Sequence, residues 1–288
     1  MNKTFEMILT QQINWADSNQ IHFVINPFGE AHTSTLPANI FYPVLSTSSV
    51  GEYSAGKGNE FQDHMKSLCS SSALVVNVFE YWRQNERVSN IAAACGKYSQ
   101  DVQMSFEKTH PILEFGTPPH LDIEFIGSGT KPLAVESKFT EPYRSKITRR
   151  NGTHLNKYLE IDDVWRGLDD LKQVAQEVLA QEGERTSWGY LDVPQLIKHI
   201  LGLSREYTPQ GFTLLYLWYD LDSEAKEQQQ EILKFQQRIS SEVDFRSMRY
   251  QSLFDEIQLI PKVDFEYIEY LRERYFNEGS SYLRNCDF

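Results

Sequence analysis

The 288-residue sequence lacks several features that mark common protein classes. Its only cysteines, Cys69, Cys95 and Cys286, are far apart and form no Cys-x-x-Cys pair. This argues against a disulfide framework or a zinc site and favours a reduced, cytoplasmic protein. No apolar run approaches the roughly 18 residues that a membrane-spanning helix needs. The first apolar segment is short and carries Glu6, so we expect no signal peptide.

Positive charge is also scarce. Lys and Arg number 28 against 40 Asp and Glu, which gives a net charge of −12 and speaks against a surface coated in positive charge for nucleic acid. Residues 142–158 are the exception, because they contain no acidic residue. Their cations are Arg144, Lys146, Arg149, Arg150 and Lys157. The segment predicts a phosphate-binding arm, although a solvated surface loop explains it too.

Apolar residues make up 40% of the chain and aromatic residues 13%, which is typical of a globular protein. We expect one domain over residues 1–288. Its parts would be an irregular N-terminal arm (1–57) with one or two short strands or helices, a core (58–220), and C-terminal helices with a strand (221–288).

A β-hairpin is predicted from His120 to Lys138. Leu121, Ile123 and Phe125 alternate with acidic residues, as in a half-buried strand. A Gly- and Pro-containing break follows, and then a second alternating run from residue 133.

The hairpin brings together two carboxylates and an ammonium group. Glu136 and Lys138 share one strand face, about 7 Å apart along the chain. Pairing around the turn places Asp122 across from Glu136 on that face. Two nearby carboxylates suit Mg²⁺ or Mn²⁺. A neighbouring lysine can orient a metal-bound water and stabilise charge growing on a phosphate.

The pattern Asp122, then Glu136-Ser137-Lys138, resembles that of the PD-(D/E)xK, or restriction-endonuclease-like, nuclease superfamily. His120-Leu121 stands where the name-giving Pro precedes the Asp. The segment from Glu136 to Pro142 and the helix around residues 72–79 look like those of a bacterial subgroup described as restriction endonucleases. The resemblance implies an α/β fold with an αβββαβ core, a mixed central sheet flanked by helices, and a helical insertion at about 143–190.

The resemblance also implies a function, Mg²⁺- or Mn²⁺-dependent hydrolysis of phosphodiester bonds in DNA by a restriction-type endonuclease. Asp122, Glu136 and the Ser137 carbonyl would hold the metal, Lys138 would position the attacking water, and Glu60 would complete the site from the preceding helix. The alternatives to these implied roles are few. Glu124 or Glu141 can substitute for a named ligand, and Glu60 can simply favour a helix N-terminus.

Partners follow from the same resemblance. A Gln on the helix after the lysine strand approaches DNA in some of these nucleases, and Gln195 resembles it. RNA stays open as a substrate. A homodimer is plausible because two related sites cut a duplex most easily, and a restriction role requires a methyltransferase partner.

Apolar periodicity predicts the remaining elements. A helix capped by Asn59 carries a stripe from Phe61 to Trp82. The apolar run at residues 211–219 predicts a buried strand, and residues 245–260 a strand or short helix. Further helices are expected over 88–95, 161–180, 193–203, 224–239 and 263–275.

Two other functions compete with the nuclease. Gly51 to Gly58 nearly matches a phosphate-binding loop with Lys57, but Gly58 replaces the hydroxyl residue that would contact Mg²⁺. The other is a non-catalytic nucleic-acid-binding or assembly protein that retains the nuclease fold. The acidic net charge and the missing Pro before Asp122 favour it, and the intact Asp, Glu and Lys set disfavours it.

Overall fold

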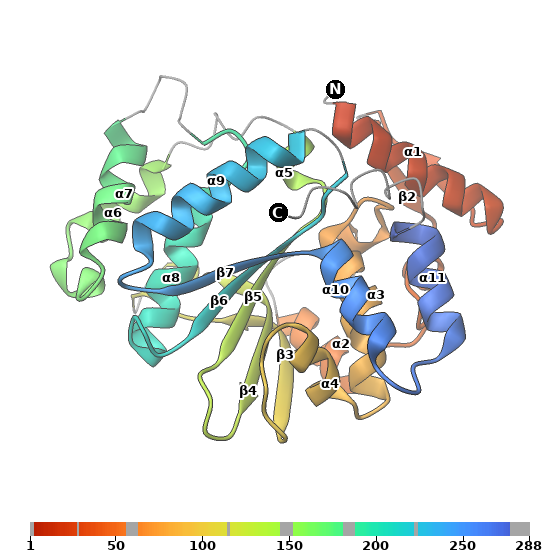
Figure 1. Cartoon of the computed structure of the whole chain (residues 1–288). Helices are drawn as coiled ribbons and strands as arrows, with labels where there is room; N and C mark the ends of the chain where they lie inside the picture. The colour runs from red at the N-terminus through yellow and green to blue at the C-terminus, as the bar shows by residue number, and fades with distance from the viewer. Residues whose placement is uncertain are drawn as a thin grey trace.

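A five-stranded mixed sheet, in the order β3-β4-β5-β6-β7, lies at the centre of the molecule (Figure 1). The computed structural model describes residues 3–27, 29–55, 63–113, 116–144, 152–180, 188–221 and 224–276. β3, β4 and β5 are antiparallel, whereas β5, β6 and β7 are parallel. The strands are β3 (Val102–Thr109), β4 (His120–Gly127), β5 (Leu133–Lys138), β6 (Thr213–Trp218) and β7 (Asp244–Arg249).

The alternation of strand side chains divides the core into two apolar layers. In β6, Leu215 and Leu217 pack into the layer on one face, and Leu214 and Tyr216 into the layer on the other. Because β6 is covered on both faces, all of its residues are buried, as the continuous apolar run predicted.

Helices cover both faces of the sheet (Figure 1). The face that carries Leu215 packs against α1 (Lys3–Ser18), α2 (Thr47–Ala55), α3 (Ser71–Gln84), α4 (Val88–Ala94), α10 (Tyr250–Leu259) and α11 (Phe265–Tyr275). The face that carries Leu214 packs against α7 (Asp169–Ala180), α8 (Val193–Tyr207) and α9 (Glu224–Ile239). Two one-turn helices, α5 (Glu141–Arg144) and α6 (Asn156–Leu159), lie between β5 and α7. The expected αβββαβ order is therefore present as α4, β3, β4, β5, α8 and β6.

Two helix predictions were wrong in their boundaries. The helix expected from Asn59 begins at Ser71, because Ser70 caps it by accepting a hydrogen bond from the N–H of Ala73 (3.2 Å). Of the apolar residues expected in its first turns, Met65 lies buried in a 3₁₀ turn, His64–Lys66, and Phe61 lies outside the described residues. The helix expected over 161–180 is interrupted, since a 3₁₀ turn ends at Trp165 and Gly167 adopts a φ of +74° before α7 begins.

The N-terminal arm is more regular than expected. It contains the 16-residue α1, a hairpin of β1 (Phe23–Ile25) and β2 (Ala31–Thr33), a 3₁₀ turn (Leu36–Asn39) and α2. The fully buried Arg274 of α11 connects this arm to the C-terminal layer, because its guanidinium donates to Gln12 and to Asn39. The arm is thus packed on the core. Residues 245–260, expected to be a strand or a helix, form both β7 and α10.

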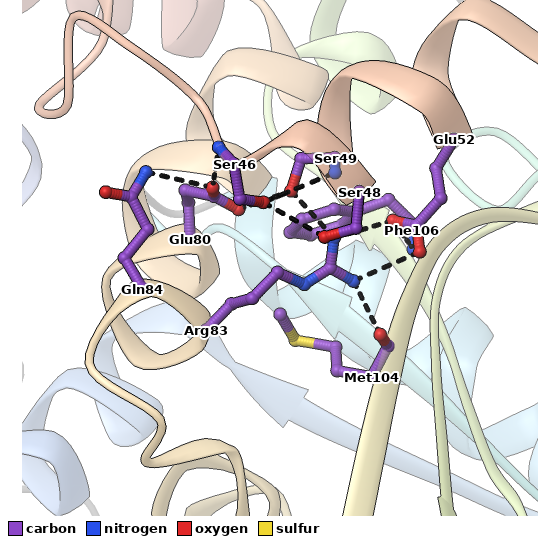
Figure 2. Close-up of polar contacts among 9 residues, drawn as sticks. All are labelled: Ser46, Ser48, Ser49, Glu52, Glu80, Arg83, Gln84, Met104 and Phe106. Atoms are coloured by element: carbon purple, nitrogen blue, oxygen red, sulfur yellow. Dashed lines mark hydrogen bonds and ion pairs between the residues drawn. The ribbon is translucent and has the colours of Figure 1, made fainter.

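The outer edge of β3 is covered by side chains of α2 and α3 (Figure 2). Glu52 accepts a hydrogen bond from the backbone N–H of Phe106 (3.0 Å), and Arg83 donates to the carbonyl of Met104 (2.5 Å). Arg83 also pairs with Glu52 (2.7 Å). Exposed strand edges invite pairing with other chains, so these contacts close one edge of the sheet.

Candidate active site

The β4–β5 hairpin confirms the prediction for residues 120–138. Ile123 pairs with Val135 and Glu124 with Ala134, and the same register carried one residue further sets Asp122 opposite Glu136. The Asp122 carboxylate accepts a hydrogen bond from the backbone N–H of Ser137 (2.7 Å). Asp122 is thereby fixed against the strand segment that carries Glu136 and Lys138.

Glu136 and Lys138 form a buried ion pair on the sheet face that α8 and α9 cover. Lys138 Nζ lies 2.5 Å from Glu136 Oε1, and only 2% of the Glu136 side chain is exposed. Burial alone lowers the pKa of Lys138, but the negative charges of Glu136, Glu141 and Asp122 outweigh it and the net shift is upward. Lys138 therefore carries a positive charge at neutral pH.

His199 approaches the same carboxylate from α8. Its Nε2 lies 3.2 Å from Glu136 Oε2, and both side chains are buried. Burial is the main cause of a lowered pKa for His199, which favours the neutral imidazole. One hint of this contact was visible in the sequence, a lone His on the apolar face of a helix, one turn after Gln195.

The carboxyl group of Asp122 has a raised pKa, first because it is buried and then because Glu136 repels its negative charge. A divalent cation between the two carboxylates would remove that repulsion. A strand residue directs its N–H and C=O to the same side, so the Ser137 carbonyl faces β4 as its N–H does. Two carboxylates and one carbonyl are oxygen donors that fit Mg²⁺ or Mn²⁺. Within the described ranges, no three His, Cys, Asp or Glu side chains form a metal-holding group.

Glu107 of β3 is a neighbour of this site that sequence reasoning missed. Its φ of +51° is unusual for a residue with a side chain, and its charge adds to the raised pKa of Asp122. His120 Nδ1 lies 3.6 Å from its carboxylate. Its position opposite Asp122 follows from the pairing of β3 with β4, which the sequence pattern did not predict.

Glu124 and Glu141, the two residues that could substitute for a named metal ligand, have other partners. Glu124 is buried and accepts a hydrogen bond from the Tyr207 hydroxyl (3.0 Å), while its Oε1 lies 3.3 Å from His110 Nε2. The Glu141 carboxylate accepts from the backbone N–H of Phe139 (2.9 Å), and its charge reaches Lys138.

The predicted nucleic-acid contacts divide into described and undescribed residues. Arg144 forms an ion pair with Glu30 and donates to Thr140 Oγ1 (3.0 Å). Gln195 is half-buried in the first turn of α8. Four of the predicted residues, Glu60, Lys146, Arg149 and Arg150, lie outside the described ranges. Gly51, the first residue of the phosphate-loop pattern, lies inside α2, and its Lys57 is also outside those ranges.

Comparison with known proteins gives one result. A family model described as Restriction Endonuclease associating with ARP matches residues 13–276. It agrees with the restriction-endonuclease resemblance that Asp122, Glu136 and Lys138 carry. Searches of curated proteins and of solved structures gave no match. No helix in the described part of the chain has the length and apolarity to span a membrane.

Proposed function

Because the chain belongs to the family Restriction Endonuclease associating with ARP, we propose that it is a metal-dependent endonuclease of restriction type that hydrolyses phosphodiester bonds in DNA. One observation carries the proposal. The hairpin holds Asp122 to the N–H of Ser137, next to the Glu136–Lys138 ion pair. Two carboxylates and a protonated lysine together can hold a divalent cation and stabilise charge that grows on a phosphate.

The residues of the candidate site have different proposed roles. Asp122, Glu136 and the Ser137 carbonyl would hold Mg²⁺ or Mn²⁺, with Glu60 as a further acidic group. A cation bound there would supply Lewis-acid activation of the phosphate and of a water molecule. The charged Lys138 orients the attacking water and offsets the negative charge that grows on the phosphate. In the hydrolysis, the water oxygen bonds to phosphorus and the bond from phosphorus to the leaving oxygen breaks. The proton that the water loses passes to solvent, and the leaving oxygen takes up a proton from solvent.

Contacts to DNA are proposed for residues around the carboxyl end of β5. Arg144 follows Lys138 closely, and Lys146, Arg149 and Arg150 continue the basic segment. Gln195 lies one turn before His199 and therefore on the same face of α8. Basic side chains would bind phosphates without regard to sequence. A strong salt dependence of DNA binding is the expected consequence.

The family description also names an association with ARP, and we extend that association to this chain. Two copies of the chain, and a methyltransferase that protects the host's own DNA, complete the partners that a restriction role calls for.

A non-catalytic nucleic-acid-binding or assembly role is the alternative, and one observation favours it. Glu136 is almost fully buried, and Lys138 and His199 stand at its two oxygens. A site built only for binding would keep such a closed ion pair.

Cleavage assays separate the two functions. The wild type is incubated with plasmid, single-stranded DNA and RNA, in Mg²⁺, in Mn²⁺ and in EDTA, beside Asp122→Ala and Lys138→Ala. The nuclease proposal predicts metal-dependent cleavage that both variants lose. Binding of DNA without cleavage of any substrate, equal in all three proteins, supports the alternative.

A further inference from the structure

Ser137 places a hydroxyl in an apolar layer, on the face of β5 opposite to Glu136 and Lys138. Val135 and Phe139, two residues before and after it, both pack into that layer. Only 1% of Ser137 is exposed. A buried hydroxyl lowers stability unless it has a hydrogen-bond partner, so the partner of Ser137 is of interest.

Tyr250 is that partner. It is the first residue of α10, directly after β7, and it is fully buried. Its hydroxyl oxygen lies 2.6 Å from Ser137 Oγ, and either group can donate the hydrogen bond. Burial raises the pKa of Tyr250 well above its usual range, so the hydroxyl keeps its proton at neutral pH. The contact joins β5 to a residue 113 positions later in the chain.

The backbone of Ser137 is bonded as well. Its N–H donates to the Asp122 carboxylate (2.7 Å). Asp122 therefore holds Ser137 within the sheet, and Tyr250 holds it from one face. Glu136 precedes Ser137 in the chain, and the Ser137 carbonyl is itself a proposed metal ligand. A rotation of this one residue would change the distances among the proposed ligands of the hairpin.

Stability alone does not account for the two hydroxyls. Two hydrogen-bonded partners can be replaced by apolar groups of the same shape at almost no cost in stability. A hydrogen bond is directional, however, and a satisfied buried polar pair favours one arrangement of the groups around it. Compared with an apolar contact, the contact between Ser137 and Tyr250 therefore adds a fixed orientation of Ser137.

We propose that Tyr250 is a positioning residue for the metal site. By holding the Ser137 hydroxyl, it fixes residue 137 so that the N–H reaches Asp122 and the carbonyl faces β4 with it. Helix α10 thus supports the site from the opposite face of the sheet. The role toward a metal rests on the proposed nuclease function. The contact itself rests on the two hydrogen bonds of Ser137.

The effect of Tyr250 on Ser137 can be measured without metal or DNA. In ¹⁵N-labelled protein in EDTA, the amide proton signal of residue 137 should move upfield in Tyr250→Phe, because a weaker hydrogen bond to Asp122 shields that proton. Tyr267→Phe is the matched control. Tyr267 is fully buried in the same apolar layer, and its hydroxyl donates to the Val78 carbonyl (2.7 Å). Its loss should leave the signal of residue 137 in place.

Metal binding tests the positioning role. In calorimetric titration, Tyr250→Phe should bind Mn²⁺ about tenfold more weakly than the wild type or worse. Tyr267→Phe should keep the wild-type affinity, although it also loses a buried hydrogen bond. Ser137→Ala removes the other hydroxyl and should weaken binding as Tyr250→Phe does. The double variant should lose no more than either single variant, because both substitutions remove the same contact.

The two measurements separate the positioning role from the nuclease function. An unmoved signal of residue 137 in Tyr250→Phe overturns the positioning role. Where the wild type binds Mn²⁺, equal affinities in Tyr250→Phe and Tyr267→Phe also overturn it. A moved signal in a wild type that binds no Mn²⁺ supports the contact of Tyr250 with Ser137 and refutes only the metal-dependent nuclease proposal.

Discussion

The Asp122 carboxylate accepts a hydrogen bond from the backbone N–H of Ser137, across the pair of strands that form the hairpin. The bond does more than align two strands. It places Asp122 beside Ser137, which lies between Glu136 and Lys138 in the sequence. Asp122, Glu136 and Lys138 are therefore placed by backbone geometry rather than by long flexible side chains, which is the arrangement that a preorganised site requires.

Asp122 should make the metal-free protein less stable at neutral pH. Its folded-state pKa is raised above the ordinary 3.8, so the folded state holds this proton more tightly than the unfolded state. The free energy of unfolding then falls as pH rises through the folded pKa. Asp122→Asn removes this loss. In EDTA, the Tm of the wild type should drop relative to that of the variant as the pH rises above 3.8.

Divalent cations should reverse this difference in Tm between the wild type and Asp122→Asn. A cation that binds only the folded state raises Tm, and Asp122→Asn lacks one of the two carboxylates that would hold it. Mg²⁺ at neutral pH should raise the Tm of the wild type more than that of the variant. Equal shifts would show that Asp122 is not a ligand.

His199 should control the affinity for the cation. Its Nε2 lies 3.2 Å from Glu136 Oε2, beside a proposed metal ligand, and loss of such an outer contact typically costs about 10–100-fold in metal affinity. His199→Leu should weaken Mn²⁺ binding by about that factor in calorimetric titration. His22→Leu is the control, because His22 is bonded to Ser34 on the exposed surface. Identical affinities in the two variants would assign His199 to packing alone.

Arg83 should be essential for the stability of the covered sheet edge. Arg83→Met breaks the contacts to Glu52 and to the Met104 carbonyl (Figure 2) and leaves partly buried groups unmatched. We expect the free energy of unfolding in urea to fall by about 2–4 kcal/mol. Size-exclusion chromatography should show more self-association, since the edge of β3 is uncovered.

A matched control for Arg83 exists on the surface. Arg166 pairs with Asp163, and both side chains are mostly exposed. Arg166→Met should change stability by less than about 1 kcal/mol. A loss of the same size in both variants would contradict the special role given to the Arg83 contacts.

The hairpin could be predicted from the sequence because it is local. Alternation of apolar and acidic residues sets which side chains share a face, and the break at Gly127–Pro132 limits the register. That pattern predicted that Asp122, Glu136 and Lys138 lie close together. The buried strand β6 and the helix α9 were also predicted, because long apolar runs and long helical periods are strong signals.

Contacts between distant elements could not be predicted. His199 meets Glu136 only because α8 packs on β5, and Glu107 lies near Asp122 because the β3–β4 register, with Phe106 opposite Ile123 and Lys108 opposite Leu121, places it there. Glu124 has the same spacing signal as Asp122, and only packing against His110 and Tyr207 distinguishes it. The start of α3 was missed for a related reason. Buried residues of a 3₁₀ turn, such as Met65, fit a helical period without being in an α-helix.

Single-turnover cleavage of plasmid DNA in Mn²⁺ by Asp122→Asn and Glu124→Gln tests the central claim most directly. The two residues lie on the same strand, two positions apart, and both substitutions keep the side-chain shape. The account predicts that Asp122→Asn loses cleavage by at least about 100-fold, a typical loss for a group that acts at the reacting atoms, while Glu124→Gln keeps it. Cleavage that survives in Asp122→Asn and is lost in Glu124→Gln would contradict the assignment of the site.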